Sequence, residues 1–140
     1  MKNAISLFDF PGGIHPPENK TQSTQLPLGS LPIPPQLFIP LSQHIGAPAK
    51  AVVKVGDRVL AGQLIGAADG TFSANVHASS SGIISAIGAH PLPHPSGMSG
   101  ECILIDTDDK HEFIALESCR NVYQQDRLAL LEKIRAAGVA

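Results

Sequence analysis

Apolar residues along this chain occur in short, β-branched runs that are separated by glycine and proline, which is the pattern of a small β domain. Residues 37–107 contain most of these runs. The strongest is Glu101–Thr107, in which apolar side chains occupy both alternating faces. We therefore predict a strand there that is buried on both sides.

Two parts of this central region repeat the order strand, glycine turn, strand. The first covers residues 51–67, with turns expected at Gly56 and Gly62, and the second covers residues 76–89. Glycine adopts positive φ without steric cost, so it suits such reversals. Two interlocked sets of short strands resemble the barrel-sandwich hybrid fold of biotinyl and lipoyl carrier domains. We predict this mainly β fold over residues 37–117.

The two ends of the chain differ from the central region. Residues 1–36 are rich in proline, and we expect an extended leader that packs on a neighbouring surface. Residues 118–140 hold a predicted helix, Asn121–Ala137, with apolar residues at three-residue spacing and Gly138 as its stop. We expect this helix to lead into a nucleotide-binding domain that lies beyond the chain.

Composition excludes several classes of protein. The 140 residues have a formal net charge of −2, and the basic residues are dispersed, so neither nucleic acid nor anionic lipid has an evident patch to bind. No window approaches about 18 consecutive apolar residues, so we expect no span of a membrane. Cys102 and Cys119 lack metal-ligand spacing and are interpreted as reduced thiols.

A carrier function requires a lysine at the tip of the central hairpin, where biotin or lipoate is attached. No lysine occurs between Lys54 and Lys110. The central turns offer Asp69-Gly70-Thr71 and Ser79–Ser81, which cannot form that amide, and no GxSxG motif surrounds the serines. A carrier therefore stays an alternative interpretation, and we predict no catalytic residue in this chain.

Six histidines suggest a second alternative, a stand-alone module that binds a metal or small ligand. His90 and His94 lie in a predicted long loop, His90–Gly100, whose prolines exclude the helical geometry that a four-residue spacing would need. No HExxH or CxxC motif is present. We interpret the histidines as surface or loop residues that form ordinary hydrogen bonds. The alternative hypothesis is that His77, His90 and His94 gather at one rim as a polar docking surface.

Five segments together closely resemble the N-terminal part of the RnfC family, which belongs to the Rnf electron-transport complex, the ion-translocating ferredoxin:NAD oxidoreductase. Three of them are specific to that family. The glycine-turn motif is shared with carrier domains, membrane-fusion adaptors and the related sodium-pumping quinone reductase. The segments are Gly12–Lys20, Ile39–Pro48, Val55–Gln63, Val76–Gly82 and Pro93–Gly97.

The resemblance implies a peripheral subunit on the cytoplasmic side of the bacterial inner membrane. Its complex transfers electrons between NADH and ferredoxin and couples this to ion translocation. The parent subunit is implied to use FMN, NADH and two [4Fe–4S] clusters, whose family motifs follow the region that this chain resembles. We therefore expect no cofactor-binding, metal or catalytic residue in this segment.

The remaining role is structural, and its implied partners are proteins. They are the rest of the RnfC polypeptide, the other Rnf subunits including integral membrane ones, and ferredoxin as a further candidate. Nucleic acid is not among them. The candidate docking residues are His15, Glu18, Lys20, His44, His77, His90 and His94.

Overall fold

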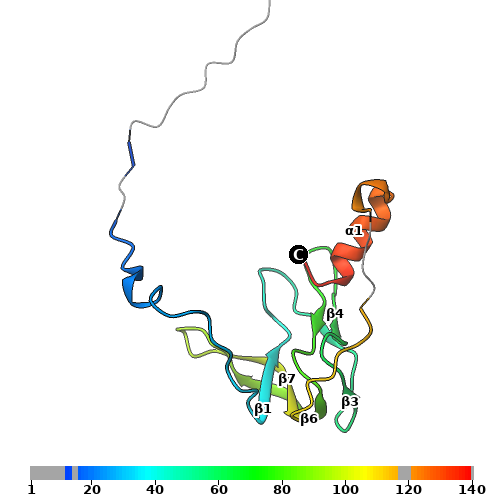
Figure 1. Cartoon of the computed structure of the whole chain (residues 1–140). Helices are drawn as coiled ribbons and strands as arrows, with labels where there is room; N and C mark the ends of the chain where they lie inside the picture. Colours follow the sequence, from blue (N-terminus) through cyan, green and yellow to red (C-terminus); the bar gives the residue numbers. More distant parts are fainter. Residues whose placement is uncertain (1–11, 14–15, 117–120, 140) are drawn as a thin grey trace, which may run out of the picture. The chain divides into compact units, whose positions relative to one another are not determined.

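The computed structural model describes residues 12–13, 16–116 and 121–139, and the chain divides into two units, residues 1–31 and residues 32–140. In the first unit, all described residues are exposed, and one short 3₁₀ turn, η1 (Lys20–Gln22), is present. The second unit holds every strand of the described chain (Figure 1).

The described part of the second unit contains two small antiparallel sheets. Between β2 and β6 the chain passes repeatedly from one sheet to the other, which interlocks the two sequence repeats and confirms the predicted mainly β architecture. The four-stranded sheet has the order β1 (Gln36–Pro40), β7 (Ser99–Thr107), β6 (Gly82–Pro91) and β3 (Arg58–Val59), and the three-stranded sheet has the order β2 (Lys50–Ala51), β4 (Leu64–Ala67) and β5 (Val76–His77).

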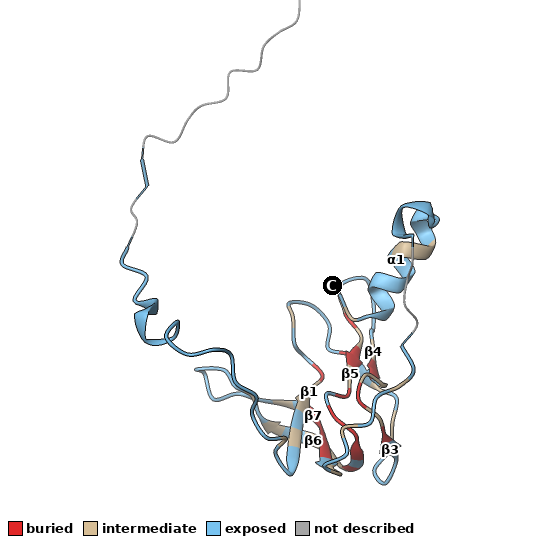
Figure 2. Ribbon diagram, in the orientation of Figure 1, coloured by how far each residue is buried: buried red, intermediate tan, exposed pale blue. Residues whose placement is uncertain are grey.

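The core is aliphatic and receives side chains from both sheets. Figure 2 shows buried segments, in red, in both sheets. The predicted burial of the Glu101–Thr107 run is confirmed, because the four consecutive residues Cys102–Ile105 are all buried. Burial of one such side chain contributes about 1.5–3 kcal/mol. The buried cluster consists of Leu41, Ala49, Val59, Ile65, Val76, Ala78, Ile84, Ile103 and Ile105.

The β6–β7 hairpin corrects the predicted long loop at His90–Gly100. Strand β6 continues to Pro91 and β7 already begins at Ser99, so only residues 92–98 form the turn. The Leu92 N–H donates to the Met98 carbonyl at 2.9 Å. Because bonded and non-bonded positions alternate in an antiparallel ladder, the preceding Pro91 needs no N–H toward β7.

The C-terminal helix exists but starts later than predicted. It consists of a 3₁₀ turn, η2 (Val122–Gln124), followed by α1 (Arg127–Ala136). Asp126 sets this start, because its carboxylate accepts hydrogen bonds from the N–H groups of Leu128 and Ala129 at 3.0 and 3.2 Å. Gly138, with φ +80°, follows the helix end as predicted.

Gly82→Ala is expected to destabilise strongly the two sheets of the second unit, which we call the β unit. A Cβ at this position would overlap the carbonyl oxygen of Asp106 in β7, and the backbone cannot move aside without loosening the β6–β7 pairing. We expect the free energy of unfolding, measured by urea denaturation, to fall by about 1–3 kcal/mol or more.

Gly88→Ala is the matched control in the same strand. An added Cβ there meets no atom within 4 Å, so we expect a change below about 1 kcal/mol. Equal losses in the two variants would contradict the close approach at Gly82.

Candidate functional site

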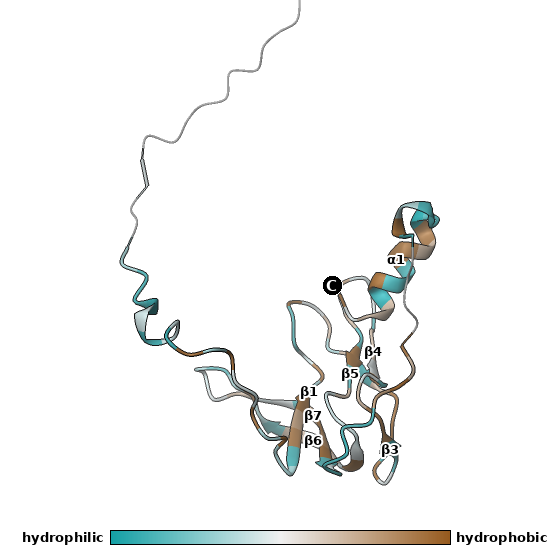
Figure 3. Ribbon diagram, viewed as in Figure 1, coloured by the Kyte–Doolittle hydropathy of each residue, from teal (hydrophilic) through white to brown (hydrophobic). Residues whose placement is uncertain are grey.

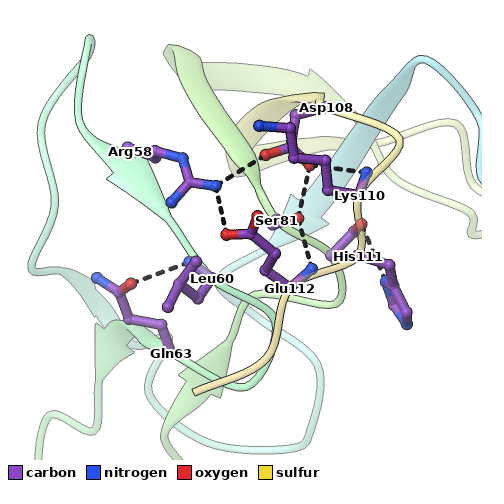
Figure 4. Close-up of polar contacts among 9 residues, drawn as sticks. Arg58, Leu60, Gln63, Ser81, Asp108, Lys110, His111 and Glu112 are labelled. Atoms are coloured by element: carbon purple, nitrogen blue, oxygen red, sulfur yellow. Dashed lines mark hydrogen bonds and ion pairs between the residues drawn. The ribbon is translucent and has the colours of Figure 1, made fainter.

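A polar cluster joins two consecutive serines to the segment that follows β7 (Figure 4). Ser81 Oγ donates to Asp108 Oδ1 at 2.6 Å and accepts from the Glu112 N–H at 2.9 Å. Ser80 Oγ lies 3.2 Å from His111 Nδ1. Both serine residues are at most 1% exposed. The two hydroxyls therefore lie inside the fold, where their hydrogen bonds join the residues before β6 to the segment after β7.

Arg58 of β3 completes the cluster from the other side (Figure 4). Its Nη2 lies 3.1 Å from Asp108 Oδ2 and 2.8 Å from Glu112 Oε2. These carboxylates raise the pKa of Arg58, with Glu112 as the larger cause. The hydrogen bond from Ser81 is the main cause that holds the pKa of Asp108 below its ordinary value, and Lys110 N–H and Arg58 act in the same direction.

The cluster fixes the path by which the chain leaves the β unit. The Ala61 N–H donates to the Glu112 carbonyl at 2.8 Å, and the Ile114 N–H donates to the Ala61 carbonyl at 3.0 Å. These bonds place Phe113 beside Ala61 as a parallel bridge. The sequence pattern predicts a turn at Ser79–Ser81 but does not predict its bonds to the segment after β7. The available sequence signal is the pair of acidic residues Asp108 and Glu112, which follow a strand closely.

His44 ties together two loops that are far apart in the sequence. Its Nε2 accepts the Ala74 N–H at 2.9 Å, and its Nδ1 lies 3.0 Å from the Ile45 carbonyl oxygen. The neutral ring therefore carries its proton on Nδ1. The Ala47 N–H adds a bond to the Phe72 carbonyl at 2.9 Å. Both ring nitrogens of this candidate docking residue are thus engaged internally.

The other candidate histidines are not gathered in one place. His77 lies in β5 and pairs with Leu64 of the three-stranded sheet. His90 lies in β6, where its ring meets that of Phe38 edge-on at a centroid distance of 5.2 Å. His94 lies in the β6–β7 turn. The fold thus brings His90 and His94 to the same hairpin and places His77 in the other sheet.

The candidates in the first unit are described only in part. Glu18 and Lys20 form an exposed ion pair at 3.0 Å. His15 lies outside the described residues. This pair is solvent-exposed, so it contributes little to the stability of the unit.

The described residues do not offer a set of metal ligands. Within them, no group of three or more His, Cys, Asp or Glu residues could hold a metal ion. Cys102 is buried, which raises the pKa of its thiol, and Cys119 lies outside the described residues. An iron–sulfur cluster needs several thiolates together, so the described side chains do not fit one. Among the helices in the described ranges, none has the length and apolar character needed to cross a bilayer.

The β4–β5 loop, Ala68–Asn75, occupies the place between the two repeats where a carrier would present its lysine. Side-chain bonds hold it: the Ala68 N–H donates to Asn75 Oδ1 at 2.9 Å, and the Asp69 N–H donates to Ser73 Oγ at 3.0 Å. The loop presents Phe72, which is 79% exposed. The loop is thus held by hydrogen bonds, exposes an aromatic side chain and contains no lysine.

Among the hollows that described residues of the second unit line are the following two. One, of about 890 Å³, separates the β4–β5 loop from α1 and is lined partly by Phe72, Ala136 and Val139. The other, of about 590 Å³, lies between the end of β1 and the β6–β7 turn. Its lining consists of Pro40, Ser42, Gln43, Leu92, Pro93, His94 and Met98.

Comparison with known proteins agrees with this architecture. The family described as RnfC barrel sandwich hybrid domain matches residues 8–110. The chain is 48% identical over 134 residues to the C subunit of the ion-translocating oxidoreductase complex of Pseudomonas aeruginosa, covering 96% of this chain and 17% of that protein. The corresponding proteins of Vibrio cholerae and Klebsiella pneumoniae are 46% and 45% identical, again over 96% of this chain. The chain spans 17–18% of the length of these curated relatives.

Ser81→Ala is expected to loosen the segment that follows β7. The substitution leaves the Glu112 N–H without its acceptor and removes the donor to Asp108. We expect the free energy of unfolding to fall by about 1–3 kcal/mol in chemical denaturation. Ser85→Ala is the control, because its hydroxyl donates to Asp106 at a more accessible site. A larger loss in the control would refute this role of Ser81.

Asp108 is expected to make stability fall in acid. Because its pKa is lowered in the folded chain, the ionised carboxylate contributes stability that is fully present above the ordinary aspartate pKa of about 4. That contribution is lost as the pH falls through the lowered folded value. The stability difference between wild type and Asp108→Asn should therefore shrink in acid. Asp109→Asn controls for the loss of one negative charge, and an unchanged difference for Asp108→Asn would contradict the prediction.

Proposed function

We propose that this chain, which belongs to the RnfC family of ion-translocating oxidoreductase complex proteins, is the structural and docking domain of its subunit. It would hold neighbouring parts of the subunit and of the complex in place, while electron transfer occurs elsewhere.

One observation carries the proposal: the polar groups of the cluster bond to one another within the domain, while several large apolar side chains of the second unit remain exposed. Asp108 bonds to both Ser81 and Arg58. In contrast, Phe72 and Val139 at the larger hollow are 79% and 58% exposed. Figure 3 shows brown apolar positions alternating with teal ones along α1. Such unpartnered apolar side chains support contact with protein.

The activity that this domain would serve is electron transfer between NADH and ferredoxin, coupled to ion translocation. The names of the relatives support an ion-translocating oxidoreductase. The donor, the acceptor, FMN and two [4Fe–4S] clusters rest on the family resemblance. We place no iron–sulfur cluster on the described residues, because no group of three or more His, Cys, Asp or Glu residues among them could hold a metal ion. The subunit would sit peripherally on the cytoplasmic side of the bacterial inner membrane.

The proposed partners are of two kinds. The first is the rest of the same polypeptide, a nucleotide-binding domain that would cover the exposed Leu128 and Ile134 of α1, which are 70% and 47% exposed. The second comprises the other Rnf subunits, integral membrane ones included, with ferredoxin as a further candidate. The leader, residues 1–36, would contact a neighbour through His15, Glu18 and Lys20.

Deleting residues 1–31 from the complete gene product is expected to weaken assembly without unfolding the β unit. The deletion spares Pro34 and Pro35, whose carbonyls accept bonds from Thr107 Oγ1 and N–H at 2.7 and 2.9 Å. We expect less of the protein to be retained when the complex is purified through a tagged membrane subunit.

A second variant tests whether the leader acts through its own side chains or only through its length. Replacing Gly12–Lys20 by a glycine–serine segment of equal length should weaken retention as the deletion does. Circular dichroism and urea denaturation check that the β unit stays folded. Full retention of both variants would refute the contact role of the leader.

A further inference from the structure

Two long stretches of the second unit contain no charged side chain. Residues 32–49 and residues 70–100 lack Asp, Glu, Lys and Arg entirely. Hairpin tips and surface loops of a protein that contacts only water normally carry charges. Depletion of charged residues is a compositional mark of the centre of a protein interface.

The fold brings these two stretches together at the smaller hollow. Strands β1 and β6 both pair with β7, and the Phe38 ring meets His90 across them. The first stretch supplies Pro40, Ser42 and Gln43 to the hollow, and the second supplies Leu92, Pro93, His94 and Met98. Every lining residue is therefore uncharged, and Met98 and Phe38 are 58% and 49% exposed.

The charge pattern also selects the kind of partner. A surface for anionic lipid needs Lys or Arg side chains, and neither stretch provides one. An acidic or basic protein surface would find no Asp, Glu, Lys or Arg among the residues that line the hollow, and it would lose hydration on docking. Met98 adds a flexible, polarizable side chain that adapts to an apolar neighbour. These features favour a neutral, apolar protein segment.

His94 supplies one directed polar group at the wall of the hollow. Its Nδ1 accepts the Ser96 N–H at 3.2 Å and lies 2.7 Å from Ser96 Oγ. The neutral ring therefore carries its proton on Nε2. With Nδ1 engaged by Ser96, Nε2 is the ring nitrogen left to donate to a backbone carbonyl of a partner.

We propose that the hollow between the end of β1 and the β6–β7 turn receives an apolar, uncharged segment of another protein of the complex. An apolar side chain of that segment fills the hollow, and one of its carbonyls accepts a hydrogen bond from His94 Nε2. The proposal rests on the proposed docking function and names the place and the chemistry of one contact.

The test uses a photo-crosslinking amino acid in the complete gene product within the assembled complex. The probe replaces Met98 in one variant and Val55 in the other, since these residues are similarly exposed, at 58% and 61%. We expect the Met98 probe to yield a crosslink to an uncharged apolar peptide of another protein of the complex, at least fivefold above the Val55 probe. A crosslink to its own polypeptide, to a second copy or to lipid, or equal yields from both probes, would overturn the proposal.

Charge substitution provides an independent readout. Met98→Glu should reduce retention of the protein in the purified complex at least tenfold, Val55→Glu should not, and Met98→Leu should retain it. Unchanged urea denaturation of each variant excludes unfolding as the cause. If leader variants weaken assembly but Met98→Glu behaves like Val55→Glu, only this inference fails; if neither affects assembly, the proposed docking function fails as well.

Discussion

The β unit depends on the close approach of β6 to β7 where β6 begins. Gly82 makes this approach possible, because a side chain there would meet the Asp106 carbonyl. The same approach brings the preceding Ser81 within 2.6 Å of Asp108, two residues after the contact. Arg58, from the neighbouring strand β3, then closes the cluster. The absence of a side chain at Gly82 thus permits both the pairing of β6 with β7 and the path of the segment that follows β7.

Local chemistry could be predicted from the sequence, and long-range pairing could not. The stop at Gly138 and the burial of Cys102–Ile105 each depend on residues close together in the chain, and both predictions are confirmed. The bond between Ser81 and Asp108 joins positions 27 residues apart, and that between Arg58 and Asp108 spans 50. No periodicity connects such positions. The predicted hairpin boundary is wrong for a related reason, because whether Pro91 interrupts a strand depends on which way its nitrogen faces.

The scaffold resembles a carrier, but its central loop contains no lysine and is held by internal hydrogen bonds. A carrier presents a lysine and a mobile prosthetic arm. Here the Ala68–Asn75 loop is tied to its own ends and, through His44, to a distant loop. Phe72 is therefore an exposed aromatic group on a constrained backbone. A surface that is already ordered loses less conformational entropy when a partner binds, which is the property that a docking element needs.

Charged residues are distributed unequally along the chain. Ion pairs of Arg58 with Asp108 and Glu112 hold the segment that follows β7. The charged side chains of α1 are exposed. The stretch from residue 70 to residue 100 has none. An ion pair buried in an interface gains little over an apolar contact once desolvation is counted. The contact proposed for the neutral surface is therefore electrostatically separate from the ion pairs that hold the segment after β7.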